Sequence, residues 1–395
     1  GAHADGRAMK ESFSSPGATA RQLSAKDAEG GQILSVVCKR TYSVDGRGRL
    51  SRASEQIPLF EDFIVDPAAP AVLVHDTDLV AFKPLTDVLV LGHAYAPGPA
   101  SSVLTAVRVG ERSKQVLVVG DRRAALSHTG RLLFSDPAPF ERMPLGYDRA
   151  YGGIDAVAEA RLGDPTAPIK ACMPREAQGP GASEYSYPRN VAGKGYLIEA
   201  TPDAVEALAL PNLEDPEDRL TPERLVVGST LSWPRMPLPA SYGPLDYGWF
   251  PRFGYMGVVP LHDQEHAVFQ EVRRGFAPAS ILKETFLTPD HDVDLRFTCC
   301  GSLGLQLPHL EGDEEIALYN LHPRHPKWEI RLPGERPEIA TDGRNGKMNK
   351  ADPVIQTITI EPDHDRVTVV WRGAARAIRP YMPAELEKMP LRVAW

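Results

Sequence analysis

The chain has 395 residues, 42% of them hydrophobic and 24% charged, which is ordinary for a soluble globular protein with more than one core. Its 44 basic and 52 acidic residues give a net charge of -8, which argues against a nucleic-acid partner because such proteins present basic surfaces. None of the four cysteines forms a CxxC pair, so neither a disulfide framework nor a zinc site is indicated. No apolar run approaches the ~18 residues that a membrane span needs, so we expect no span.

The first 30 residues are small and polar, and we interpret 1–30 as a mobile N-terminal segment. Residues 1–8 fit no element, and Met9 is a candidate native start. The segment also lacks the apolar region of a signal peptide, so the expected location is the cytoplasm.

Short apolar runs, rich in β-branched residues, predict several strands in the first third of the chain. Gly, Pro and Ser separate these runs, and long helical patterns are rare, which is typical of an antiparallel sandwich or barrel. The predicted strands are 33–44, 87–97, 103–110 and 114–122.

Residues 123–255 contain many of the 37 prolines and long segments without periodicity. Glycine permits a positive φ and proline fixes φ, so this composition predicts an ordered, irregular layer over a sheet. One short helix is predicted at 202–209, with Thr201 as its N-cap and Pro202 in its first turn.

Strand patterns return in the last third of the chain, after a second helix predicted at 263–275. A turn at 363–365 would join the last two strands as a hairpin. The predicted strands are 293–300, 314–321, 327–333, 354–362 and 366–373.

The sequence therefore predicts a mainly β protein with two antiparallel, sandwich-like lobes and few short helices. The N-terminal lobe covers 31–275 and includes the irregular Pro/Gly-rich layer that connects the lobes. The C-terminal lobe covers 276–395, because the β pattern resumes near residue 285.

The string from His262 to His266 is the most enzyme-like motif in the chain. An HxxEH pattern on a helix places two imidazoles on one face, with Glu265 available as a general base of a zinc hydrolase. A third ligand is needed and no residue stands out for that role. We therefore favour an exposed helix start here, expect no cofactor or metal, and keep a metal-dependent hydrolase using His262, Glu265 and His266 as an alternative.

Several strings resemble, in order, one bacterial family, the domain-of-unknown-function family twenty-one-sixty-nine. Together they cover roughly residues 30–375. They are Val37-Cys38-Lys39-Arg40-Thr41-Tyr42, Asp78 with Lys83-Pro84-Leu85-Thr86-Asp87, Gly120-Asp121-Arg122, Pro139-Phe140 with Met143-Pro144-Leu145, Ala150-Tyr151-Gly152-Gly153, Gly193-Lys194-Gly195-Tyr196, Leu210-Pro211-Asn212-Leu213-Glu214, Gly312-Asp313-Glu314, Leu332-Pro333-Gly334 and Val369-Val370-Trp371-Arg372.

The chain departs from the family pattern at a few positions, which indicates a divergent member. Asn190-Val191-Ala192 stands where the family tends to have Asn-Pro, and the usual tryptophan after Gly120-Asp121-Arg122 is absent.

The resemblance implies a type VI secretion accessory protein, a non-enzymatic adaptor or chaperone that binds an effector or spike-tip protein for loading. Such a role needs a rigid scaffold with shaped loops and no catalytic residues. As a hypothesis, partner contact falls on residues of the 76–87, 143–155 and 187–196 strings, with a structural role as the competing interpretation. These residues are Asp78, Lys83, Asp87, Arg149, Tyr151, Arg189, Lys194 and Tyr196.

A carbohydrate- or surface-binding β module is the remaining alternative. It requires exposed aromatic rings along a groove, for which the candidates are Tyr242, Tyr247, Trp249 and Phe250.

Overall fold

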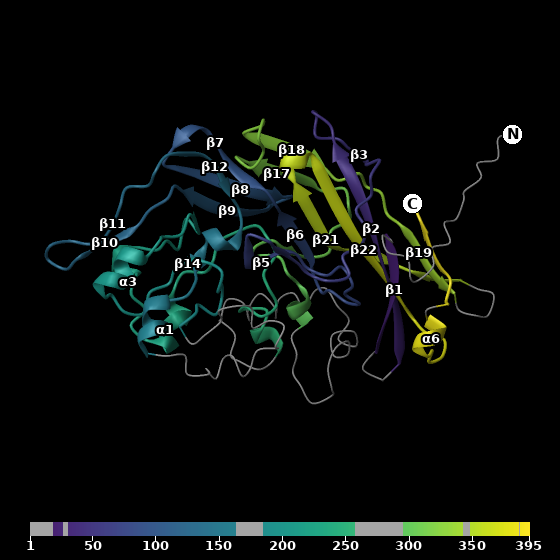
Figure 1. Cartoon of the computed structure of the whole chain (residues 1–395). Coiled ribbons are helices and arrows are strands. Elements are labelled where there is room, and N and C mark those ends of the chain that lie inside the picture. Colours follow the sequence, from purple (N-terminus) through teal and green to yellow (C-terminus); the bar gives the residue numbers. More distant parts are fainter. Residues whose placement is uncertain (1–18, 27–30, 163–184, 257–294, 343–347, 387) are drawn as a thin grey trace.

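The structure is a computed structural model that describes residues 19–26, 31–162, 185–256, 295–342, 348–386 and 388–395. The predicted helix at 263–275, the HxxEH string and Cys172 lie outside these residues. The chain is mainly β, as predicted, with short helices and several sheets (Figure 1).

The larger sheet has seven strands drawn from both ends of the chain. Its order is β1-β2-β22-β21-β6-β16, with β3 also paired to β2. All pairs are antiparallel except β6 with β21, which is parallel. The strands are β1 (Ala20–Lys26), β2 (Gln32–Val44), β3 (Leu50–Arg52), β6 (Thr86–Val90), β16 (Gln306–Leu307), β21 (Pro353–Glu361) and β22 (Arg366–Arg376).

A second sheet has five antiparallel strands in the order β15-β9-β8-β17-β18. Its strands are β8 (Ser102–Val109), β9 (Arg112–Val119), β15 (Leu213–Glu214), β17 (Glu315–Tyr319) and β18 (Lys327–Arg331). The side chains that alternate inward from both sheets, such as Val116 and Ile316 from one and Ile358 and Trp371 from the other, belong to one hydrophobic core. We call this part the sandwich.

The predicted lobes at 31–275 and 276–395 do not correspond to separate sheets. β2 pairs with β22, and β8 pairs with β17, so strands from both ranges share each of the two larger sheets. The two ranges share a sheet because β22 is an interior strand, which is hydrogen-bonded to β2 on one side and to β21 on the other. Within residues 1–30, which the composition predicts to be mobile, Ala20–Lys26 forms β1, and every residue of β1 pairs with β2.

Smaller sheets and helices surround the sandwich. The paired strands are β4 (Ile64–Asp66) with β5 (Ala69–His75), β7 (His93–Ala100) with β12 (Phe140–Pro144), β10 (Ala124–Leu126) with β11 (Leu132–Phe134), β13 (Tyr151–Gly152) with β14 (Lys194–Gly195), and β19 (Glu338–Asp342) with β20 (Met348–Ala351) and β23 (Leu391–Ala394). The described α-helices are α1 (Ala156–Leu162), α3 (Pro202–Ala207) and α6 (Pro383–Leu386). None of the described helices is long and apolar enough to cross a membrane.

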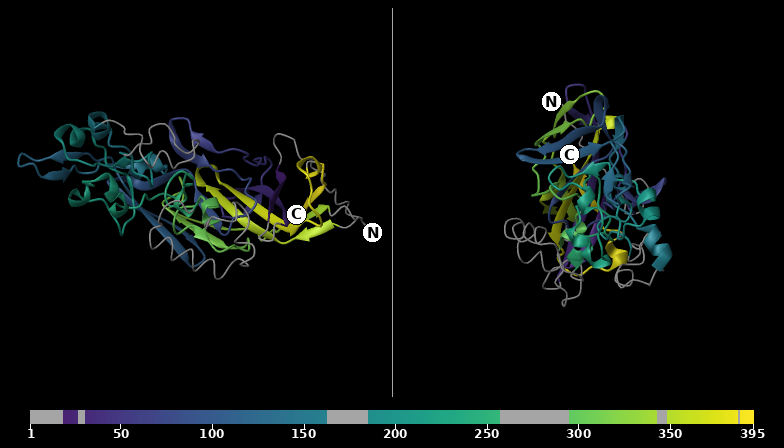
Figure 2. Two further views of the ribbon diagram at one scale, coloured as in Figure 1. Left: turned by 90° about the horizontal axis from the view of Figure 1, so that it is seen from below. Right: turned by 90° about the vertical axis from the view of Figure 1, so that its left-hand side faces the viewer.

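Part of the irregular layer forms a second core at one end of the molecule, while other parts of it pack into the sandwich core. Figure 2 shows an elongated molecule, with α1, α3 and their neighbours at one end and the C-terminus at the other. We call this end the tyrosine-rich region, because buried tyrosines fill its centre. Its buried apolar residues are Ala124, Tyr151, Ala158, Tyr185, Tyr187, Tyr196, Leu197, Ile198, Ala204, Val205, Leu210, Leu220, Leu225 and Met236.

Most predicted elements are confirmed with small shifts of their ends. The predicted strand at 87–97 is two strands, because Gly92 adopts φ +138° between β6 and β7. The predicted helix at 202–209 is α3, and the Thr201 side chain accepts a hydrogen bond from the Ala204 amide. The strand predicted at 293–300 is wrong, because Leu295–Thr298 is a 3-10 helix.

Candidate binding site

Asp78, Lys83 and Asp87, which were predicted to contact a partner, lie inside the protein. They are on the face of the seven-stranded sheet that points away from the sandwich core. Asp78 is buried, and its carboxylate accepts hydrogen bonds from the Lys39 ammonium at 2.6 Å and the Phe60 amide at 2.8 Å. Burial lowers the pKa of Lys39 even though Asp78 opposes the shift. Asp78 therefore joins β2 to the loop that precedes β6.

Lys83 and Asp87 form a second buried ion pair, with 2.6 Å between Nζ and Oδ2. The same carboxylate oxygen accepts the backbone amide of Cys300, and Lys83 also donates to Thr357 on β21. Burial disfavours the Lys83 ammonium, but the attraction of Asp87 outweighs it, so the pKa of Lys83 is raised. The arrangement ties three segments together and leaves neither charge available to a partner.

The predicted contact residues of the 143–155 and 187–196 strings lie mainly in the tyrosine-rich region. Tyr151 and Tyr196 are buried in its core, and their rings contact Tyr187. Burial raises the pKa of both phenols above the ordinary value. Arg189 is also buried and donates to the hydroxyl of Tyr187. These three side chains are structural in the described conformation.

Arg149 and Lys194 are the predicted residues that reach the surface. Their charged ends lie 3.8 Å and 4.0 Å from the exposed carboxylate of Asp121. Burial lowers the pKa of Lys194, and the nearby Arg149 lowers it further. The structure therefore brings Arg149 and Lys194 together, and separates them from the buried pairs of the 76–87 string.

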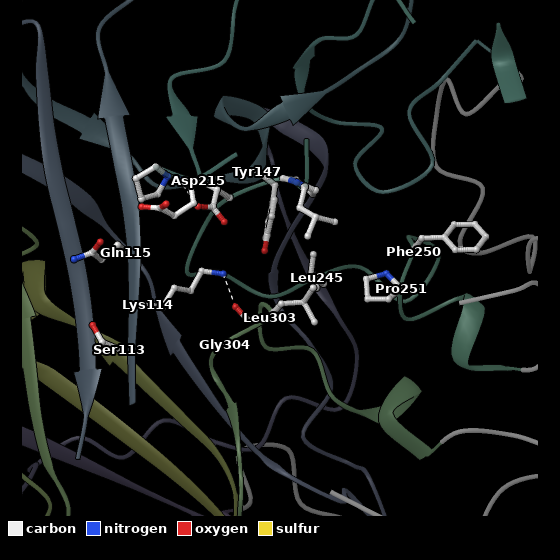
Figure 3. Close-up of a pocket in the computed structure, with 15 residues that line it drawn as sticks. Ser113, Lys114, Gln115, Tyr147, Asp215, Leu245, Phe250, Pro251, Leu303 and Gly304 are labelled. Atoms are coloured by element: carbon white, nitrogen blue, oxygen red, sulfur yellow. Dashed lines mark hydrogen bonds between the residues drawn. The ribbon is translucent and has the colours of Figure 1, made fainter. Parts of the chain in front are cut away.

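A cleft that the sequence analysis did not identify lies beside β9 (Figure 3), and we call it the Lys114 cleft. Its volume is about 320 Å³. The lining residues are Ser113, Lys114, Gln115, Tyr147, Asp215, Pro216, Glu217, Leu238, Pro239, Ala240, Leu245, Phe250, Pro251, Leu303 and Gly304.

Lys114 projects into this cleft from the face of β9 that points to the core (Figure 3). Its stem lies over Gly304, and its ammonium donates to the Leu303 carbonyl at 2.7 Å. Burial lowers the pKa of Lys114 to about 8, although the charge of Asp215 opposes the shift. The amine is thus held in a poorly solvated position with one backbone acceptor.

The backbone of β9 has an open edge along the cleft. The Val119 amide donates to the Asn212 carbonyl, so the backbone groups of Val119, and of every second residue before it, point toward β15. β15 pairs only with Val118 and Leu117. The backbone groups of Ser113 and Gln115 therefore face the cleft, and no described strand lies beside them.

Apolar side chains form the opposite side of the cleft. Leu238, Leu245 and Pro251 line it, and the buried ring of Tyr147 packs edge-on against Trp249 at 5.7 Å between centroids. An open strand edge facing an apolar wall is the arrangement that binds an extended peptide segment.

The signal that could have identified this cleft is a position in β9. Lys114, Val116 and Val118 are spaced two residues apart, so they lie on the same face of the strand. Val116 and Val118 are buried in the sandwich core, and Lys114 is therefore a charged residue at an inward-facing position. Asp215 and Leu303 are distant in sequence and carry no comparable signal.

Two further expectations concern metals and aromatic rings. Among the residues that the structure describes, no group of three or more His, Cys, Asp and Glu could hold a metal ion. His262, Glu265 and His266 lie outside that set. Of the four rings predicted for an exposed aromatic groove, Tyr242, Trp249 and Phe250 are buried and Tyr247 is half-buried.

Comparison with known proteins identifies the family. A family model described as "Uncharacterized protein conserved in bacteria (DUF2169)" matches residues 29–372. The chain belongs to this family. The resemblance drawn from the sequence strings is thereby confirmed, while no curated protein and no solved structure matches the chain significantly.

Proposed function

We propose that this DUF2169 protein is a non-catalytic adaptor that binds an effector or spike-tip protein of a type VI secretion system during loading in the bacterial cytoplasm. The observation that carries the proposal is the Lys114 cleft, where the open edge of β9 faces an apolar wall. The secretion system itself is proposed from the family resemblance.

In the proposed complex, an extended segment of the partner lies beside Ser113 and Gln115 and continues the sheet where β15 ends. Main-chain hydrogen bonds to β9 supply part of the affinity, and alternate side chains enter the apolar part of the cleft. Lys114 has two further donors beyond its bond to Leu303, and it can offer them to a partner acceptor.

The buried ion pairs support this role by holding the scaffold. Asp78 and Asp87 connect loops to the seven-stranded sheet, and Asn212 connects β9 to the tyrosine-rich region through hydrogen bonds to Val119 and Arg149. A cleft built between segments that are fixed in this way is preformed, which reduces the entropic cost of binding.

Affinity capture from lysate of the source bacterium, with mass spectrometry of the bound proteins and metal analysis of the bait, tests the proposal. We expect the wild-type protein to retain a secretion effector or a spike-tip protein. Recovery of no such protein, or stoichiometric zinc without a protein partner, would contradict it.

A matched pair of variants at one position tests the strand-addition geometry. Ser113→Pro removes an amide that faces the cleft and blocks the strand edge, whereas Ser113→Ala changes only the side chain. We expect the proline variant to lose the partner and the alanine variant to retain it. Equal capture by both variants would place the contact elsewhere.

A further inference from the structure

Arg372, in β22, is a buried arginine without an anionic partner. The residue is 7% exposed, and its Nε has no hydrogen-bond partner. No hydrogen bond or ion pair from its guanidinium is found among the described residues, and burial alone lowers its pKa to about 10. An arginine this deeply buried is normally paired, because an uncompensated charge is costly to desolvate.

Other buried basic groups of this protein show the usual pattern. Arg122 pairs with Glu214 at 3.1 Å, and Arg252 pairs with Asp76 at 2.9 Å. Arg372 instead lies over the ring of Phe82, with 5.0 Å from its guanidinium carbon to the ring centroid. The ring is thus a cation–π neighbour of the guanidinium, which makes no hydrogen bond to another described residue.

Arg372 belongs to the outer face of the seven-stranded sheet. It stands opposite Val37 on β2 and Val354 on β21, whereas its neighbour Trp371 points into the sandwich core. The residue lines an open groove of about 710 Å³, which we call the Arg372 groove. The other lining residues are Ile33, Ser35, Ala81, Phe82, Met348, Asn349, Lys350, Asp352, Ala374, Ala375, Arg376 and Ile378.

The groove combines positive charge with exposed apolar surface. Lys350 and Arg372 against Asp352 give a formal charge of 2 - 1 = +1, on a protein whose net charge is -8. Met348 and Ile378 are 40% and 54% exposed, so two large apolar side chains of the groove face solvent. The groove therefore complements an anionic group with apolar neighbours.

We propose that the Arg372 groove binds a carboxylate of a protein partner, presented by an acidic residue that has apolar residues beside it. The proposal rests on the proposed function only for the existence of a protein partner. The planar guanidinium of an arginine can bind a carboxylate through two parallel hydrogen bonds, and that of Arg372 has no such partner among the described residues. A single buried arginine suits a monovalent carboxylate better than a phosphate, whose second charge would need further donors.

Peptide binding tests the site directly. The probes are acetyl-Leu-Glu-Leu amide, its Gln-containing counterpart and inorganic phosphate, each titrated up to about 10 mM, where weak binding is still measurable. The readout is the NMR signal of the Arg372 Nε–H. We expect the Glu peptide to shift this signal and to bind about tenfold more tightly than the Gln peptide, because the ionised acceptor strengthens the hydrogen bonds.

Substitution of the arginine separates a binding role from a structural one. In Arg372→Met, a residue of similar length without charge replaces the unpaired cation, so we expect an unchanged or raised Tm and loss of the preference for the Glu peptide. Arg122→Met is the control, because it leaves the buried carboxylate of Glu214 with less compensation and should lower the Tm.

Three outcomes would overturn the inference. They are equal binding of the Glu and Gln peptides, a shift of the Arg372 signal by phosphate but not by the Glu peptide, and a lowered Tm of Arg372→Met with peptide preference retained. Capture experiments separate this inference from the proposed function. If wild type and Arg372→Met capture a secretion protein equally, the groove is not its site. If wild type captures none, the proposed function fails while the peptide result stands.

Discussion

The sandwich and the tyrosine-rich region provide hydrogen-bond partners for their buried backbone groups in different ways. In the sandwich, long strands pair with one another, so the backbone is satisfied by ladders and the core contains mainly apolar side chains. In the tyrosine-rich region, the ladders are two or three residues long. Its backbone therefore needs other hydrogen-bond partners.

Buried polar side chains provide those partners. The Asn190 amide donates to the carbonyls of Tyr147 and Tyr151, at 2.8 Å and 3.1 Å. The Asp155 carboxylate accepts the amides of Ala158 and Ile198, both at 2.9 Å, and so links the start of α1 to a distant segment. An irregular region can therefore be fixed in place without long strands when a few buried polar residues bond its backbone.

The largest expected effect concerns a buried polar residue of the seven-stranded sheet, so it tests whether polar side chains also stabilise the sandwich. Asp87→Ala leaves the Lys83 ammonium buried without its carboxylate and removes the acceptor of the Cys300 amide. We expect a loss of about 3–5 kcal/mol in the free energy of unfolding, measured with urea. Replacing both partners, as Lys83→Met with Asp87→Leu, should recover most of the loss, and failure to do so would contradict this assignment.

Asn190→Ala tests the tyrosine-rich region. Two buried carbonyls lose their donors, so the free energy of unfolding should fall by about 2–4 kcal/mol. The fluorescence of Trp233, which packs against the tyrosine-rich core, reports this transition after the other tryptophans are replaced by phenylalanine. A loss below about 0.5 kcal/mol, the size of an ordinary surface substitution, would show that the amide does not hold the loops.

Lys114, at the edge of the sandwich, should make the free energy of unfolding depend on pH. Its pKa is about 8 in the folded protein and 10.5 in the unfolded chain, so the unfolded chain binds more protons between these values. The folded state is therefore penalised below pH 8, and stability rises as the pH increases to 10.5. Lys114→Met should be more stable than wild type by about 1–3 kcal/mol at pH 7, and the difference should vanish near pH 11.

Chemical denaturation of both proteins across this pH range measures the difference. A difference that stays constant between pH 7 and pH 11 would mean that Lys114 keeps its ordinary pKa in the cleft.

The smallest expected effect concerns a helix cap in the tyrosine-rich region. Thr201→Ala removes the side-chain acceptor of the Ala204 amide at the start of α3. The free energy of unfolding should fall by about 1 kcal/mol, as for other N-caps, while Thr201→Ser should be nearly neutral. Equal losses in both variants would show that the hydroxyl does not cap the helix.

The sequence was informative where a local rule decides the structure. The alternation of apolar residues predicted the long strands, such as 366–373, and Thr201 with Pro202 predicted the start of α3. The strand predicted at 293–300 was wrong, because the packing of Cys299 and Cys300 around the Lys83–Asp87 pair decides that segment. Its apolar composition fits a buried 3-10 turn as well as a strand.

The candidate sites were harder to predict, because they depend on contacts between distant segments. Asp78, Lys83 and Asp87 were predicted as partner-contact residues, with a structural role as the competing interpretation, and the structure gives each charge a buried partner. Arg372 appeared only within a family string, and nothing in the sequence indicates that it lacks a partner. The Lys114 cleft combines segments from 113 to 304, which no local pattern brings together.

In the proposed complex, the open edge of β9 receives a partner strand. Hydrogen–deuterium exchange of the amides of Ser113 and Gln115, compared between the free protein and its complex with a captured secretion protein, tests it most directly. The account predicts that both amides exchange readily in the free protein and become protected in the complex. A stable complex in which these two amides exchange as fast as before would contradict it.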